Sequence, residues 1–177
     1  MILDLAEEAR QWLRGKDTDQ WAVPWGGTGG PQRRVAKDIA AEHVWLLWDG
    51  GVSVATITID TAQPVDDAGN SIWPAQRLNE SALYVHRVIV RRSYAGQDLG
   101  GALLDWASGI AARTVETQLI RIDVWTDNLA LHDYYLRQGF EFAELRSEDD
   151  LPGYPCRALF ERRSSPLPRN PSLLSEQ

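Results

Sequence analysis

Segments with helical hydrophobic spacing alternate along the chain with segments of strand-like spacing. Apolar side chains every three to four residues predict helices over about 2–14, 32–40, 99–112 and 129–138. In the first of these, one helical face carries Ile2, Leu5, Ala9, Trp12 and Leu13. That face should pack on the rest of the protein.

Runs rich in β-branched and aromatic residues predict six strands. They span about 44–48, 52–59, 82–91, 119–125, 140–145 and 157–161. Asp49, Gly50 and Gly51 form a hairpin signal between the first two. The resulting order is two helices, three strands, a helix, a strand, a helix and two strands. It predicts a mixed α/β fold with a β–α–β unit at its centre.

The composition favours one ordinary globular domain. The chain has 177 residues, of which 44% are hydrophobic and 24% charged, which suits a single core. We expect this domain to span 1–163. The tail 164–177 contains three prolines and four serines, and we expect it to be disordered.

The charge and the cysteine content indicate which partners, metal sites and compartments to expect. The formal net charge of −7 argues against a general nucleic-acid binder and favours cationic partners. Cys156 is the only cysteine, so no internal disulfide forms, which fits a reducing compartment. His43, His86 and His132 show no ligand spacing with it, so we expect no metal site. Without a signal peptide or an apolar run of about 18 residues, we expect a cytoplasmic protein that does not enter membranes.

The stretch from Val85 to Ala107 is the most informative motif. A β-rich segment runs into a turn containing Gly96, and a helix follows that begins near Gly100 and Gly101. A helix N-terminus at the end of a strand presents unpaired N–H groups, which bind anions such as phosphate. The alternative is that Gly96 only makes a turn and the other two glycines allow close packing of the helix on the sheet.

A second group of residues follows the next strand. Asn128 stands where a helix begins and can cap it through its side-chain oxygen. Tyr134 and Tyr135 lie on that helix, and Gly139 and Phe140 end it. Adjacent tyrosines leave a helix in different directions, so one can pack in the core while the other faces a site.

Taken together, these elements resemble the GNAT superfamily of acetyl-CoA-dependent N-acetyltransferases. The resemblance is strongest from Ala82 to Phe142 and rests on element order alone from Ile2 to Ile59. It implies a mixed, centrally splayed sheet of about six to seven strands with helices on both faces. It also implies transfer of an acetyl group from acetyl-CoA to a primary amine, by direct attack through a tetrahedral intermediate.

The resemblance assigns cofactor contacts to three regions: a strand backbone for the acetyl and pantetheine part, a turn for the diphosphate, and the later helix. The residues are Val88, Ile89, Val90, Gly96, Gln97, Asp98, Leu99, Gly100, Gly101, Asn128 and Tyr135. Two positions depart from the family pattern. Ala95 replaces a polar residue, and losing the long side chain should weaken diphosphate binding modestly. Asp98 replaces a glycine, and its carboxylate either repels the phosphate or points away and favours the helix dipole. Most of the binding comes from the backbone, so we expect cofactor binding to survive both departures.

Amine acetylation needs a base for the amine and an acid for the leaving thiolate. Tyr135 is the expected acid, since the resemblance places it near the cofactor sulfur. The base stays open between Asp123, which has the spacing of the acidic base in related enzymes that acetylate protein N-termini, and His86 on the preceding strand. Glu80 is a third choice. Each also has an ordinary structural interpretation.

The acceptor is expected to be a small-molecule or peptide amine, cationic in character. Two loops should build its pocket, and their acidic and tryptophan side chains are Asp17, Asp19, Trp21, Trp25, Asp66, Asp67 and Trp73. The resemblance also allows a homodimer. The alternative function is a degenerate acetyl-CoA-binding sensor or interaction module without transfer activity, for which Ala95 and Asp98 are the support.

Overall fold

A six-stranded sheet organises the chain, which is described from a computed structural model over residues 1–22, 29–114 and 118–168. In space the strands follow the order β1-β2-β3-β4-β6-β5, and every neighbouring pair is antiparallel except β3 and β4. The strands are β1 (Val44–Asp49), β2 (Val52–Asp60), β3 (Ala82–Val90), β4 (Leu119–Val124), β5 (Glu141–Leu145) and β6 (Ala158–Arg163). The expected mixed α/β fold is confirmed.

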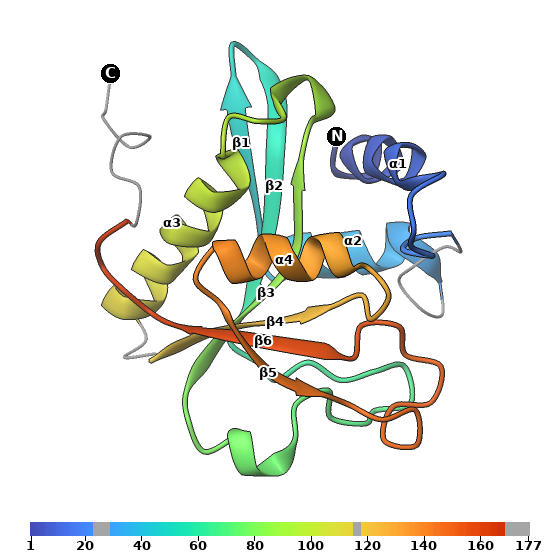
Figure 1. Cartoon of the computed structure of the whole chain (residues 1–177). Helices are drawn as coiled ribbons and strands as arrows, with labels where there is room; N and C mark the ends of the chain where they lie inside the picture. Colours follow the sequence, from blue (N-terminus) through green and yellow to red (C-terminus); the bar gives the residue numbers. More distant parts are fainter. Residues whose placement is uncertain (23–28, 115–117, 169–177) are drawn as a thin grey trace.

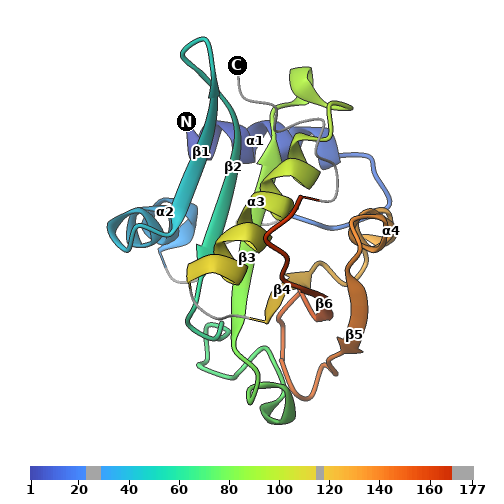
Figure 2. The same cartoon turned by 90° about the vertical axis from the view of Figure 1, so that its left-hand side faces the viewer.

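Helices cover both faces of this sheet (Figures 1 and 2). The helices are α1 (Ile2–Leu13), α2 (Gly30–Ala40), α3 (Leu99–Thr114) and α4 (Leu129–Arg137), with short 3-10 helices η1 (Ala75–Arg77) and η2 (Arg92–Tyr94). Leu104 of α3 and Tyr135 of α4 share one core with Val85 and Ile122 of the sheet. Leu5 of α1 packs against Ile89 on the other face. Val85 and Ile89 would share a face in a regular strand, so their division between two layers shows that the alternation of β3 is interrupted between them.

The expected elements are present, with ends shifted by one or two residues. The last strand spans Ala158–Arg163, not 157–161. Trp12 departs from expectation, because it is 44% exposed and lies under the Arg92 guanidinium, 4.1 Å from its ring centroid. Of the tail expected to be disordered, residues 169–177 lie outside the described residues. In the part of the chain that is described, no helix is long and apolar enough to cross a bilayer.

Strands β3 and β4 pair only at one end. Their register runs from Ala82 opposite Leu119 to Tyr84 opposite Arg121, and the strands then diverge. In Figure 1 the β1–β3 half of the sheet runs upward while β4, β6 and β5 run across it. Within the described residues, no strand pairs with the β4-facing edge of β3 beyond residue 84, so its backbone groups there can bind a ligand.

A β-bulge lies in the same stretch of β3. His86 pairs with Thr58 of β2, and Ile89 pairs with Thr56. Two residues of β3, Arg87 and Val88, therefore lie opposite the single residue Ile57 of β2. Arg87 takes a left-handed conformation with φ +48°. Its guanidinium bonds to Asp38 of α2, and to the Thr58 hydroxyl at 3.1 Å. Side-chain anchoring thus maintains a backbone conformation that costs free energy in a non-glycine residue.

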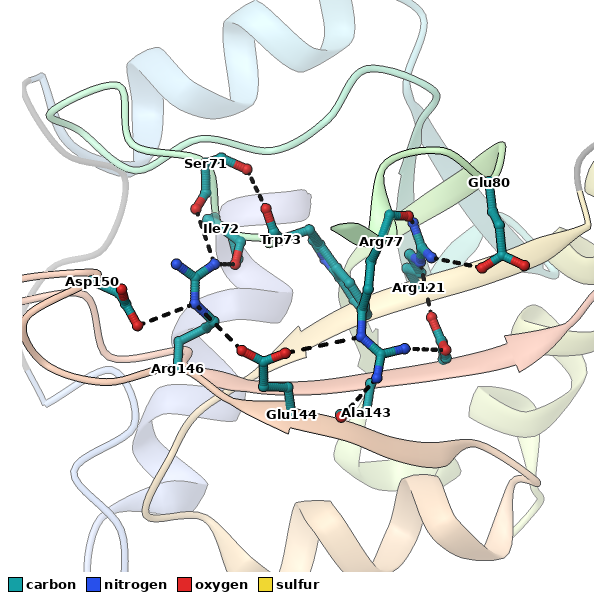
Figure 3. Close-up of polar contacts among 11 residues, drawn as sticks. Ser71, Ile72, Trp73, Arg77, Glu80, Arg121, Ala143, Glu144, Arg146 and Asp150 are labelled. Carbon is teal, nitrogen blue, oxygen red and sulfur yellow. Dashed lines mark hydrogen bonds and ion pairs between the residues drawn. The ribbon is translucent and has the colours of Figure 1, made fainter. Parts of the chain in front are cut away.

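The long connection before β3 is anchored to the sheet by arginines (Figure 3). Arg121 is fully buried; its Nε donates to Glu161 at 3.0 Å and its Nη1 to the Arg77 carbonyl at 2.7 Å. Its guanidinium lies 4.7 Å from the ring centroid of Trp73, which is also fully buried. Trp73 is therefore a core residue, and its expected place in an acceptor pocket is wrong. The connection forms a fixed wall beside the sheet.

Replacing Glu161 with Ala should destabilise the fold by about 2–3 kcal/mol, because it leaves the buried Arg121 charge without its nearest carboxylate. The remaining carboxylate, Glu80, is half exposed and 3.5 Å away. Urea unfolding measures the change. The matched control is Glu141→Ala on the neighbouring strand, since Glu141 is exposed opposite Glu161. Equal, small effects of both variants would contradict the anchoring role.

Candidate functional site

The gap between the diverging strands is a cleft of about 630 Å³. One wall comes from β3 beyond the bulge, and the other comes from β4 and the start of α4. Helices α1 and α2, the connection before β3 and the segment after β5 complete its rim. The divergence of the sheet therefore creates the main hollow at its centre, where ligands commonly bind.

Five residues expected to contact the cofactor meet in this cleft. Val88, Ile89 and Val90 line it from β3, and Asn128 and Tyr135 line it from the junction and helix that follow β4. They are separated by about forty residues in the chain. The splayed sheet thus brings together the two groups of residues that the sequence motifs singled out.

The glycine turn before α3 lies outside the cleft lining. Gly96 has φ +84° with open space around its α-carbon, so it makes the turn. Asp98, where the family pattern has glycine, takes the left-handed conformation with φ +54°. Gly100 packs directly against the Tyr134 hydroxyl, and Gly101 against the Asp98 carboxylate. The last two glycines therefore serve close packing, whether or not the turn also binds an anion. Gln97 beside them is exposed and Leu99 half-buried.

The Asp98 carboxylate lies at the N-terminus of α3. It accepts a hydrogen bond of 3.1 Å from the Gln138 side chain at the end of α4. A negative charge in this position stabilises the helix dipole and also occupies space that an anion would seek.

Asn128 caps α4 as expected. Its Oδ1 accepts from the Leu131 N–H at 3.0 Å, while its Nδ2 donates to Gln20 Oε1 at 2.6 Å. Asp127 beside it accepts from the Thr18 hydroxyl at 2.7 Å and from the Asp19 N–H at 2.6 Å. The segment after α1 is thereby tied across the mouth of the cleft.

Tyr135 is buried within an aromatic cluster and also lines the cleft. Its ring centroid lies 5.3 Å from that of Tyr134 and 5.5 Å from that of Phe140. Burial, with smaller contributions from neighbouring groups, raises the pKa of Tyr135 well above its usual value. The hydroxyl therefore keeps its proton throughout the pH range in which enzymes work.

On the opposite face of the sheet, His86 and Asp123 form a pair. His86 Nδ1 lies 3.5 Å from Asp123 Oδ1, and the Tyr154 hydroxyl donates to Asp123 Oδ2 at 2.6 Å. Burial alone would raise the pKa of Asp123, but His86 and Tyr154 together bring it below its usual value. The carboxylate thus remains charged; Tyr154 bonds its Oδ2, while its Oδ1 lies near His86 without a hydrogen bond from the described residues. His86 itself faces the cleft.

The other candidates lie elsewhere or have structural roles. Glu80 is half exposed beside Arg121 and lies outside the cleft lining. Burial and, secondarily, the charge of Asp123 raise the pKa of the Cys156 thiol, which makes it a poor nucleophile although it lines the cleft. Among the expected acceptor residues, Trp21, Asp66 and Asp67 line the cleft, Asp17 and Asp19 do not, and Trp25 is outside the described residues.

Two residues of the cleft have no signal in the sequence. Tyr154 comes from the segment between β5 and β6 and reaches Asp123 across 31 residues of chain. Arg34 lies on α2, and from the sequence alone it looks like an ordinary surface residue of a polar helix. Neither has a spacing that would connect it to a motif.

Comparisons with known proteins agree with this geometry. The sequence model of the acetyltransferase (GNAT) family matches residues 6–140. An uncharacterised N-acetyltransferase of Bacillus subtilis, YesJ, is 32% identical over 142 residues, which cover 80% of this chain and 75% of that protein.

Solved structures of GNAT-family acetyltransferases share the fold. One from Streptococcus agalactiae superposes with a TM-score of 0.69 at 20% identity, covering 93% of this chain and 88% of its own. One from Listeria monocytogenes gives a TM-score of 0.66 at 21% identity, covering 92% and 87%.

Proposed function

Because this chain belongs to the GNAT family of acetyltransferases and is therefore an acyltransferase, we propose that it moves the acetyl group of acetyl-CoA to a primary amine. The observation that supports the proposal most directly is the cleft between β3 and β4. There a strand edge without a partner, a tyrosine hydroxyl and a histidine–aspartate pair meet in one space.

The residues present fit coenzyme A. The open edge of β3 at Val88, Ile89 and Val90 offers backbone groups to the amide-bearing pantetheine arm, and Asn128 lies across from it. The exposed turn at 95–98 leads into the N–H groups of the first turn of α3, which suit a diphosphate. Since Asn128 already bonds to Gln20, contact with the arm would replace that bond.

We assign the chemistry to three side chains. Acetyl-CoA supplies the activated acetyl thioester. His86 takes one proton from the ammonium form of the acceptor, and Asp123 orients the imidazole through Nδ1. The amine nitrogen then bonds to the acetyl carbon and the carbon–sulfur bond breaks. Tyr135 gives its proton to the sulfur and is reprotonated by the second amine proton, so the net release is one proton.

Charge supports an amine that arrives as a cation. The whole chain has a net charge of −7, and Asp66 and Asp67 stand at the rim of the cleft with the Trp21 ring nearby. The Asp66 carboxylate already accepts bonds from Asn70 and from the Ala68 N–H, so its charge is present but its position is fixed. These charges attract an ammonium ion toward the cleft, but they do not specify which amine it belongs to.

Release of free thiol from acetyl-CoA across a panel of primary amines tests the proposed function. We expect amine-dependent thiol release, with the acetylated amine identified by mass spectrometry. If coenzyme A binds but no amine releases thiol, the chain is a binding module and the transfer proposal is wrong.

Replacing Asp98 with Gly should tighten coenzyme A binding about twofold to fivefold, because a negative charge at the helix N-terminus is worth about 0.3–1 kcal/mol and that charge would no longer compete with the diphosphate. Glycine also accepts the positive φ without strain. Asp98→Asn is the matched control for charge, since asparagine tolerates that conformation, and it should give most of the effect. Calorimetric titration at low salt measures the dissociation constant. Unchanged or weaker binding in both variants would refute a diphosphate site at this turn.

A further inference from the structure

An arginine without a satisfactory partner lines the same cleft as the proposed base. The Nε of Arg34, on α2, is 3.4 Å from a carboxylate oxygen of Asp38, and within the described residues that buried Nε has no hydrogen bond. The same Asp38 oxygen is bonded to Arg87. One carboxylate thus faces two guanidinium groups and balances the Arg34 charge only in part. Because the Nε itself is covered, an incoming anion would meet the outer nitrogens of the guanidinium.

Arg34 can reach a ligand in the cleft. Its side chain is 40% exposed, and the residue contributes to the cleft lining. A guanidinium presents planar, paired donors that match a carboxylate with two parallel hydrogen bonds. The chemistry of an anionic group on the acceptor is therefore complementary to this position.

Arg34 and the proposed base line the same cleft. Tyr154, which also lines it, bonds to Asp123, and Asp123 pairs with His86. The other charged side chains in the described lining are Asp66, Asp67, Arg87, Arg92 and Asp123, and Asp38 pairs with both Arg34 and Arg87. An amine at His86 and a carboxylate at Arg34 can thus belong to one small molecule.

We propose that the acceptor is an amino acid or a similarly small amine carrying a carboxylate, and that Arg34 binds the carboxylate and so determines specificity. The inference rests on the proposed acetyl transfer and names its substrate class. Charge on both groups is compatible with the acidic rim, since the ammonium end meets the acidic side chains and the carboxylate end meets Arg34.

Matched acceptors test the inference on the unmodified enzyme. Each α-amino acid is compared with its carboxamide and its decarboxylated amine, at saturating acetyl-CoA, by thiol release. We expect the best acceptor to be an amino acid, with kcat/KM at least about tenfold above that of its carboxamide, which is the range for a charge-assisted hydrogen bond. Calorimetric titration of the same ligands should show the same preference without turnover.

Arg34→Gln should remove this preference. We expect KM for the amino acid to rise about tenfold with kcat within about twofold, and the values for the carboxamide to stay unchanged. Arg34→Lys keeps the charge and should retain part of the preference. The matched control is Arg33→Gln, because Arg33 is an exposed neighbour outside the cleft lining that carries the same charge.

Two outcomes overturn the inference in different ways. If amines without a carboxylate are the better acceptors, or if Arg34→Gln affects acid and carboxamide equally, the acceptor class is wrong and the acetyltransferase proposal stands. If no amine of any kind is acetylated, both proposals fail together.

Discussion

Replacing Tyr135 with Phe should lower kcat by about 100-fold or more while changing the dissociation constant of coenzyme A by less than about threefold. The ring packs between Tyr134 and Phe140, and phenylalanine preserves that packing. What is lost is the hydroxyl, which burial keeps protonated and which lines the cleft. A general acid contributes about 10²–10⁴-fold to the rate, so the loss should appear in turnover.

Tyr134→Phe is the matched control for this prediction. Tyr134 is the adjacent tyrosine on α4, and its hydroxyl lies against Gly100 at the start of α3, on the side of the diphosphate turn. Its loss should leave turnover within a few fold. Steady-state kinetics and calorimetry on both variants separate the roles. Unchanged turnover in Tyr135→Phe would remove that hydroxyl from the chemistry.

The second large effect concerns the proposed base. His86→Gln should lower kcat/KM by about 100-fold at neutral pH, because it removes the proposed base from the cleft. Burial alone would raise the pKa of Asp123, but His86 and Tyr154 bring it below its usual value, which makes its carboxylate a weaker base. Steady-state kinetics of the variant measure the loss, and unchanged turnover would remove His86 from the chemistry.

Asp123→Asn separates orientation from proton transfer. Asparagine has nearly the same shape as aspartate, so the variant can keep the contact with Tyr154, but it removes the negative charge beside His86. We expect a loss of about tenfold in kcat/KM, smaller than that of His86→Gln. Steady-state kinetics of both variants at one pH give the comparison. A larger loss in Asp123→Asn than in His86→Gln would reverse the two assignments.

Local patterns in the sequence predicted the elements well because each reports a local preference. Runs of β-branched and aromatic residues marked β2, β3 and β4, and apolar spacing marked α1 and α3, to within one or two residues. The position of β6 between β4 and β5 was not predicted. No local pattern determines which strand edges pair, because long-range packing decides the strand order.

The cleft residues of the spaced motif could be anticipated, whereas the expectation for the loops was right only in part, with Trp21, Asp66 and Asp67 in the lining. Asn128 and Tyr135 belong to a spaced motif, whereas Tyr154 and Arg34 reach the cleft from segments without one. Trp73 shows the opposite error. Its position in a long polar loop suggested a pocket wall, but Arg121, which reads as an ordinary strand residue, lies buried on its ring and draws it into the core.

The division of the sheet into two faces has a consequence for the order of events. His86 and Asp123 project toward the layer of α1 and the long connection, whereas Tyr135 approaches from the layer of α3 and α4. Under the proposed acetyl transfer, the base and the acid would therefore act from opposite layers of the sheet, one on the acceptor and one on the cofactor sulfur. Such a layout suits direct transfer between two molecules held in the cleft at the same time.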